Sequence, residues 1–220
     1  MTGGGVRPPV DGAVALLPDY GGKRLFDLVV ALGGLVVSAP LWPLIALVIR
    51  LESTGPTLHR ATRVGRGGTP FVLLKFRSMR MGGGGPGVTA GSDARITLSG
   101  RLLRKSKLDE LPQLINVVRN EMSLVGPRPE DARYVAWYTP AQLAVLGVRP
   151  GITGAAAVAY RHEETILSKA TDVEQAYRLD VLPAKLALEL AYLDGRRLSC
   201  DLRILAETAV AVFRRATDRS

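Results

Sequence analysis

The longest hydrophobic pattern in this 220-residue chain covers residues 25–49 and is interrupted only by Asp27 and Ser38. About 20 apolar residues suffice for a transmembrane helix, so a single crossing is one interpretation. Pro40 and Pro43 remove backbone donors in the middle of the segment and predict a kink or break. Ser38 could bond a carbonyl freed at that break. Each half then reaches roughly 15–20 Å, about half of a bilayer core.

Positive residues flank this segment at both ends, with Lys23 and Arg24 before it and Arg50 after it. Cytoplasmic flanks of membrane segments tend to be positive, so both ends favour the same side of a membrane. The pattern therefore favours a re-entrant helix hairpin at about residues 24–50, which enters and leaves on one face. A kinked crossing and a buried helix of a soluble protein are the alternatives.

The remaining pattern predicts an α+β fold that is mainly helical. Two short strands around a glycine-containing turn predict a β-hairpin within residues 56–80. An apolar stripe at helical spacing covers residues 99–120, where Ser106, Asp109 and Pro112 indicate a helix boundary near residue 106 and a capping arrangement of Ser106 with Asp109. Further helices are expected at residues 163–177, 183–193 and 200–215.

The domain organisation predicted from length and composition is simple. Residues 1–20 are rich in glycine and proline and are expected to form a flexible tail. Residues 82–91 contain six glycines and a proline and are expected to form a mobile loop. Residues 21–220 are long enough for one domain with a modest core, and a single domain is expected there.

The charge of the chain implies an anionic partner. The formal net charge is +9 and the isoelectric point is near 10.1, which suits nucleic acid, an anionic membrane surface or a phosphorylated substrate. Aromatic residues make up only 5%, which disfavours base stacking, so nucleic acid is not expected as a partner. Cys200 is the single cysteine, and the two histidines show no ligand spacing, so neither an internal disulfide nor a zinc site is expected.

The candidate chemistry centres on the adjacent carboxylates Asp109 and Glu110. Carboxylates favour helix N-termini for electrostatic reasons alone, so a purely structural role is one interpretation. A carboxylate held among cations, however, stays ionised and can act as a nucleophile or a metal ligand, and arginines suit bidentate binding of phosphate. The nearby or otherwise well-placed cations are Arg101, Arg104, Lys105 and Lys107, and in other polar segments Lys75, Arg77 and Arg128.

Proline lies on both sides of Arg128. Pro127 and Pro129 fix their own φ angles and restrict the residues before them, so they would hold the guanidinium of Arg128 in place. An ordinary rigid turn is the alternative.

Several spaced motifs together resemble one family. The chain is similar to the bacterial sugar transferases, the monotopic polyprenyl-phosphate phosphoglycosyl transferases, from residue 23 to about residue 208. The resemblance is carried by the segments at residues 23–27, 38–40, 55–56, 63–65, 75–79, 102–117, 122–130 and 150–154.

This resemblance implies a two-step transfer. Asp109 would attack the sugar-bearing phosphate of a UDP-sugar and release UMP, and a polyprenyl (undecaprenyl) phosphate would then take the phosphosugar, as the first membrane step of glycoconjugate assembly. Glu110, with Asp109, would bind Mg²⁺, while Lys75, Arg77, Arg104 and Arg128 would face phosphates. The family further implies interfacial amphipathic helices beside the hairpin and the bacterial inner membrane, with the catalytic domain on the cytoplasmic face.

The chain departs from the family pattern in two places. Glu189 stands where the family often has an aspartate, and residues 154–161 are rich in alanine and lack the usual glutamine and asparagine. No further membrane spans precede the catalytic region, so a minimal catalytic unit is expected. The oligomeric state is left open, with a homodimer as one option. The alternative to an enzyme is a silent membrane-docked scaffold that binds anionic lipids or partners through its basic face.

Overall fold

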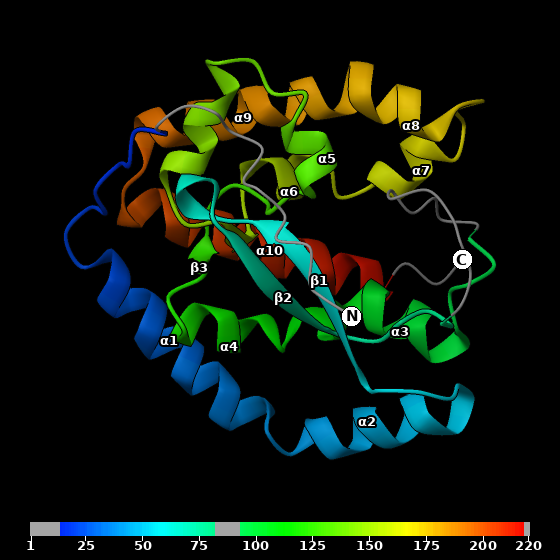
Figure 1. Ribbon diagram of the computed structural model, residues 1–220. Helices are drawn as coiled ribbons and strands as arrows, with labels where there is room; N and C mark the ends of the chain where they lie inside the picture. The colour runs from blue at the N-terminus through cyan, green and yellow to red at the C-terminus, as the bar shows by residue number, and fades with distance from the viewer. Residues whose placement is uncertain (1–13, 82–92, 218–220) are drawn as a thin grey trace, which may run out of the picture.

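The computed structural model describes residues 14–81 and 93–217 and has the expected mainly helical α+β architecture (Figure 1). Helices α1 and α2 lie along one edge, α9 lies along the opposite edge, and α10 and the strands lie between them. The helical segments are α1 (Lys23–Ser38), α2 (Leu41–Glu52), η1 (Arg66–Gly68), α3 (Leu98–Ser106), η2 (Leu108–Glu110), α4 (Gln113–Val118), α5 (Ala132–Val135), η3 (Gln142–Gly147), α6 (Ala155–Ala159), α7 (Glu163–Leu167), α8 (Val173–Ala176), η4 (Tyr177–Val181), α9 (Leu182–Gly195) and α10 (Leu198–Thr217).

The strands form two small sheets. The predicted β-hairpin is confirmed: β1 (Leu58–Val64) pairs antiparallel with β2 (Pro70–Phe76). Gly67 has a φ of 68°, which glycine adopts without strain, and this closes the turn. A second sheet pairs β3 (Ser123–Val125) with β4 (Gly151–Thr153) in parallel, and the sequence pattern did not predict it.

The apolar segment is broken at Pro40, as expected. Helices α1 and α2 meet at an angle of 62°. The Ser38 hydroxyl donates to the Leu35 carbonyl at 3.4 Å and accepts from the Trp42 indole at 3.2 Å, so it bridges the break. Pro43 lies in the first turn of α2, where a missing N–H costs little.

Neither α1 nor α2 is long and apolar enough to cross a membrane by itself, and the same holds for every other described helix. By length and composition the bent pair passes that test only when its two helices are taken together. The outer face of the pair carries many exposed large apolar side chains, namely Leu25, Val29, Val30, Leu32, Val36, Val37, Leu41, Leu44, Leu47, Val48 and Leu51.

The helical pattern at residues 99–120 is interrupted at the predicted boundary near residue 106, which is confirmed. Helix α3 ends at Ser106, and Lys107 takes the left-handed conformation with φ 60°. The turn η2 follows, and Pro112 precedes α4. The expected capping by Ser106 is wrong, because its hydroxyl donates back to the Leu102 carbonyl at 2.8 Å.

The helix expected at residues 163–177 is likewise divided. Helix α7 ends at Leu167, and α8 begins only after Asp172, whose side chain caps it by accepting from the Gln175 N–H at 3.0 Å. The chain then passes through the single π turn η4 directly into α9. The helices expected at residues 183–193 and 200–215 correspond to α9 and α10.

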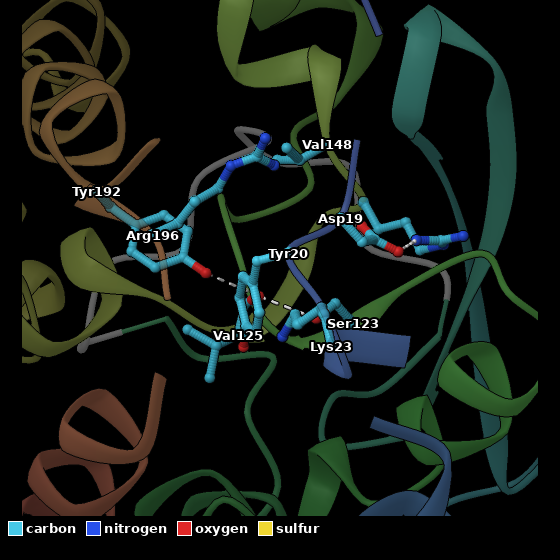
Figure 2. Close-up of a pocket in the computed structure, with 9 residues that line it drawn as sticks. Asp19, Tyr20, Lys23, Ser123, Val125, Val148, Tyr192 and Arg196 are labelled. Atoms are coloured by element: carbon cyan, nitrogen blue, oxygen red, sulfur yellow. Dashed lines mark hydrogen bonds and ion pairs between the residues drawn. The ribbon is translucent and has the colours of Figure 1, made fainter. Parts of the chain in front are cut away.

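Helix α1 is attached to the body of the protein by a buried polar cluster, here called the α1 latch: Tyr20, Lys23, Asp27, Tyr192 and Asp201. The Lys23 ammonium lies 2.6 Å from Asp201 and 3.0 Å from Asp27. The hydroxyls of Tyr20 and Tyr192 both donate to Asp201 at 2.7 Å. Figure 2 shows Tyr20, Lys23 and Tyr192 around a small cavity. The start of α1 is therefore bound to α9 and α10.

Residues 14–20, expected to belong to a flexible tail, instead lie against the folded body. The Leu17 N–H donates to the Gly147 carbonyl at 2.9 Å, and Arg149 pairs with Asp19 at 2.6 Å. Arg66 donates to the Leu17 carbonyl at 2.7 Å. These tertiary partners give residues 14–20 a fixed course along the folded body. Residues 1–13 of the expected tail and the expected loop at residues 82–91 lie outside the described residues.

Candidate active site

Asp109 and Glu110 lie in the short turn η2 between α3 and α4. Lys107 reverses the chain before them, and the Glu110 N–H donates to the Lys107 carbonyl at 3.1 Å. Leu108 and Leu111 pack against a core cluster that contains Phe76, and so anchor the turn from below. The two carboxylates are nevertheless only 6% and 7% exposed. Such burial of adjacent acids needs compensation by nearby positive charge.

Three cations supply that compensation at Glu110. Its Oε1 atom lies 3.3 Å from Lys75, 3.5 Å from Lys107 and 3.4 Å from Arg128. Burial raises the pKa of Glu110, but these three cations together lower it well below its usual range. Conversely, Glu110 raises the pKa of Arg128. Glu110 is therefore an ionised anchor for Lys75 from β2, for Lys107 just before η2, and for Arg128 from the loop after β3.

Asp109 has a different environment. Its Oδ1 atom is buried and has no hydrogen-bond partner within the described part of the chain. Burial and the adjacent Glu110 raise the pKa of Asp109, while Lys75, Lys107 and Arg104 act in the opposite direction. The positive charge of Arg104, from α3, thus helps to lower the pKa of this carboxylate. An unpartnered carboxylate oxygen beneath several cations is suited to bind a further group.

Arg128 is held by a loop of restricted geometry. Pro127 and Pro129 are buried, and the Pro127 carbonyl accepts from the Gly151 N–H at 2.8 Å. A side chain at Gly126 would come within 2.6 Å of the Arg149 carbonyl, so only glycine allows this close approach of the loop to β4. The sheet β3–β4 therefore fixes the backbone that carries the Arg128 guanidinium.

Glu189, from α9, lies behind that loop. Its Oε1 atom accepts from the Ala156 N–H at 3.2 Å, and Oε2 has no partner in the described structure. Burial raises the pKa of Glu189 to about 7, although the Ala156 bond, Lys185 and Arg128 oppose the rise. The groups around Glu189 are thus Ala156, Lys185 and the Arg128 loop, and in the described part of the chain it makes no hydrogen bond or ion pair with Asp109 or Glu110.

Arg77 is the predicted site residue that the structure places elsewhere. Its guanidinium donates to the carbonyls of Ser53 at 2.7 Å and Thr54 at 2.9 Å, and the residue is only 4% exposed. It binds the chain leaving α2, and its predicted contact with phosphate stays a prediction. Ser38 and Pro40 lie at the helix break, as expected. Lys75, Arg104, Asp109, Glu110 and Arg128 are the predicted residues that the fold brings together.

Asn116 aligns two parts of this site. It is completely buried in α4, accepts from the Leu74 N–H at 3.1 Å and donates to the Val72 carbonyl at 2.7 Å. It thereby fixes strand β2, which carries Lys75, against the helix that follows the acidic pair. Its position among the apolar residues of 114–118 is the signal that could have marked it, since a buried amide needs partners.

Among the described residues, no group of three or more histidine, cysteine, aspartate or glutamate side chains could hold a metal ion. The site instead combines two adjacent carboxylates with four cations. That surplus of positive charge around a buried acidic pair is expected of a site that handles phosphates.

Comparison with known proteins agrees with this class of site. The profile of the bacterial sugar transferase family matches residues 19–215, so the chain belongs to that family. It is 40% identical over 196 residues to the UDP-glucose:undecaprenyl-phosphate glucose-1-phosphate transferase of Caulobacter vibrioides, covering 87% of this chain and 69% of that protein.

Two shorter relatives match over most of their length. The uncharacterized sugar transferase EpsL of Bacillus subtilis is 37% identical, with 87% of each chain covered. The exopolysaccharide production protein PSS of Rhizobium leguminosarum is 35% identical, with 88% of this chain and 96% of that protein covered.

Proposed function

We propose that this protein transfers a phosphosugar from a UDP-sugar to a polyprenyl phosphate, with release of UMP. The observation that carries this proposal is the buried Asp109–Glu110 pair beneath Lys75, Arg104, Lys107 and Arg128, in a chain of the bacterial sugar transferase family. The C. vibrioides relative, whose name states such a transfer with UDP-glucose, supports it further.

In the first step, an Asp109 carboxylate oxygen attacks the sugar-bearing phosphorus of the UDP-sugar. The bond from that phosphorus to the bridging oxygen breaks, and UMP leaves with the bridging oxygen. A phosphosugar-aspartyl intermediate remains. The unpartnered Oδ1 of Asp109 supports this role, because no hydrogen bond to a described residue must be broken before it reacts.

In the second step, a phosphate oxygen of the lipid attacks the phosphorus of the intermediate. The bond to Asp109 breaks, the carboxylate is regenerated, and the lipid carries the sugar through a diphosphate. Negative charge develops on non-bridging oxygens in both steps. Lys75 and Arg128, held in place by Glu110, would stabilise that charge without having to reorganise.

The acidic pair also fits Mg²⁺. This ion usually keeps several waters and is bound through one or two carboxylates together with substrate phosphates, so it needs no larger protein cage. Glu110 and Asp109 would hold it, and its unpartnered Oδ1 makes Asp109 a suitable ligand. The ion would offset charge on the diphosphate and on the departing UMP.

We further propose that α1 and α2 form a re-entrant hairpin in the bacterial inner membrane, with the catalytic domain on the cytoplasmic face. The bend of 62° and the exposed apolar side chains support this arrangement. A lipid substrate and a soluble one can meet only at a membrane surface. The bend carries α2 back toward α3, and Glu52 at its end accepts from the Ser99 N–H at 3.0 Å.

The reaction is tested by UMP release in detergent with polyprenyl phosphate, Mg²⁺ and a panel of UDP-sugars that begins with UDP-glucose. Wild-type protein should release UMP with one or more donors, and chelation of the metal should stop the release. Asp109→Asn should be inactive and should form no phosphosugar adduct. A well-folded wild type that releases no UMP with any donor would favour the scaffold alternative.

The hairpin is tested separately with single cysteines in a Cys200→Ser background. Gly21→Cys and Thr54→Cys place a thiol just before α1 and just after α2. A membrane-impermeant maleimide should label both from the same side of sealed vesicles. Labelling from opposite sides would establish a kinked crossing instead.

A further inference from the structure

A second charged cluster lies close enough to Arg128 to influence it electrostatically. We call it the rear cluster: Glu130, Glu163, Tyr177 and Lys185. The Lys185 ammonium lies 3.0 Å from Glu163, 3.6 Å from Glu130 and 3.3 Å from the Tyr177 hydroxyl. The Tyr177 hydroxyl donates to Glu130 at 2.7 Å. These four residues come from the loop after β3, from α7, from η4 and from α9.

Two sets of carboxylates therefore act on the charge of Arg128. Glu110 on the catalytic side raises its pKa most, and Glu130 and Glu163 of the rear cluster raise it further. Without a counter-charge, two rear carboxylates would compete with one catalytic carboxylate for the same guanidinium. Lys185 neutralises one of those two charges.

Burial makes that counter-charge effective. Lys185 is 5% exposed, so its field is screened little by solvent. Tyr177 can donate only one hydrogen bond, which goes to Glu130, and its pKa is raised by burial and by Glu130. Among the described residues, Lys185 is the cation whose ammonium lies near both Glu163 and Glu130. Its charge therefore offsets the negative charge of the rear cluster.

We propose that Lys185 is a positioning residue for Arg128: by neutralising the rear cluster it keeps the guanidinium directed toward Glu110 and the diphosphate of the donor. This inference rests on the proposed function, because that function supplies the diphosphate of the UDP-sugar as the group that Arg128 faces. Lys185 itself touches no substrate in this arrangement. Its effect is carried by the orientation of Arg128, so its loss acts on donor binding before it acts on chemistry.

The test compares UDP binding by calorimetry and UMP release in four variants. Lys185→Met should weaken UDP binding about tenfold and raise the KM for the donor more than it lowers kcat, since coupled charges typically interact on this scale. Glu163→Gln with Lys185→Met removes one charge of each sign and should restore affinity to within about twofold of wild type. Glu163→Gln alone should bind UDP at least as well as wild type.

Lys169→Met is the matched control, because Lys169 is an exposed lysine shortly after α7 and its loss changes net charge equally. It should leave UDP binding unchanged.

Two results would overturn the proposal. One is a double variant that binds UDP no more tightly than Lys185→Met does, and the other is a Lys185→Met protein that binds UDP as wild type does. Measuring UDP binding separates the test of Lys185 from the test of the transferase reaction. If wild type binds UDP but releases no UMP, the transferase reaction is refuted, while UDP binding by the Lys185 and Glu163 variants still decides the role of Lys185. If wild type does not bind UDP, both proposals are refuted.

Discussion

The catalytic turn and the α1 latch are built from the same types of residue but in opposite proportions. At the latch one lysine faces two aspartates at 2.6 and 3.0 Å, and their side chains are no more than 8% exposed. At the catalytic turn three cations surround one oxygen of Glu110 at 3.3–3.5 Å, and their side chains are 22–43% exposed.

The difference lies in what remains unsatisfied. Lys23 is enclosed by carboxylates and tyrosines, so the latch has little positive charge left to offer another group. Lys75, Lys107 and Arg128 share a single carboxylate oxygen, so they retain positive charge that faces partly exposed space. A buried ion pair therefore indicates a phosphate site only when cations are in excess and partly accessible.

The largest contrast is expected in activity. Asp109→Asn should lower UMP release by at least about a thousandfold, because the amide is a poor nucleophile. Asp27→Asn, at the latch, keeps an oxygen that can accept from the Leu124 N–H and should keep UMP release per folded molecule within about threefold. The measurement is initial rate in detergent, corrected for the folded fraction. Comparable losses in both variants would break the distinction between the two clusters.

The reverse contrast is expected in stability. Lys23→Met leaves Asp27 and Asp201 without their cation and should cost about 3–5 kcal/mol. Lys107→Met removes a half-exposed partner and should cost less than about 1 kcal/mol. Denaturant titration in micelles, followed by tryptophan fluorescence, measures both. Equal stability of the two variants would show that the latch is not what holds α1.

Two arginines, the partly exposed Arg128 and the buried Arg77, sharpen the comparison further. Arg128→Lys should lower kcat/KM for the UDP-sugar about tenfold or more, since an ammonium cannot replace the planar guanidinium. Arg77→Lys should leave kcat/KM within about twofold while lowering Tm, because Arg77 binds the carbonyls after α2. If Arg77→Lys instead raised KM with unchanged Tm, its sequence-predicted contact with phosphate would be correct.

The smallest effect concerns Glu189, a buried carboxyl that forms no ion pair with any described residue. Folding raises its pKa from 4.5 to about 7, so the folded state binds its proton more tightly than the unfolded state. This group favours folding below pH 4.5, and that contribution is lost as the pH rises through about 7. Glu189→Gln should flatten this dependence by up to about 1 kcal/mol per pH unit, as measured by Tm across that range. An unchanged slope would contradict the assigned pKa.

Features with local causes could be predicted from the sequence. Pro40 breaks the apolar segment wherever the chain folds, and the glycine turn after Val64 closes the β-hairpin. The acidic pair Asp109–Glu110 and Arg128 were recognised as candidates from their neighbours in the sequence, which are cations for the pair and prolines for Arg128. The family resemblance placed Lys75 among the residues that face phosphates, but its ion pair with Glu110 became evident only in the structure.

Features with distant partners could not be predicted in the same way. Arg77 was predicted to contact phosphate, and no signal in the sequence indicated that its guanidinium donates to the carbonyls of Ser53 and Thr54. The boundary near residue 106 was predicted, but no local signal indicated the left-handed conformation of Lys107 or the separate turn η2 that follows it. Lys185 lay within a predicted helix, but its partners come from segments up to 55 residues away, and only the fold brings them together.

The α1 latch also sets an order of events during synthesis. Lys23 and Asp201 are 178 positions apart, so their contact cannot form until the ribosome has passed residue 201. Contacts of such long sequence separation form late, after the loop between them has been closed. The apolar hairpin is therefore synthesised first, and Lys23 stays hydrated until Asp201 is available. A nascent chain that stops before α10 would therefore keep the contacts of α1 with residues 114–124 but lack the Asp201 partner of Lys23. Incompletely folded chains of this kind are what chaperones and proteases act on in cells.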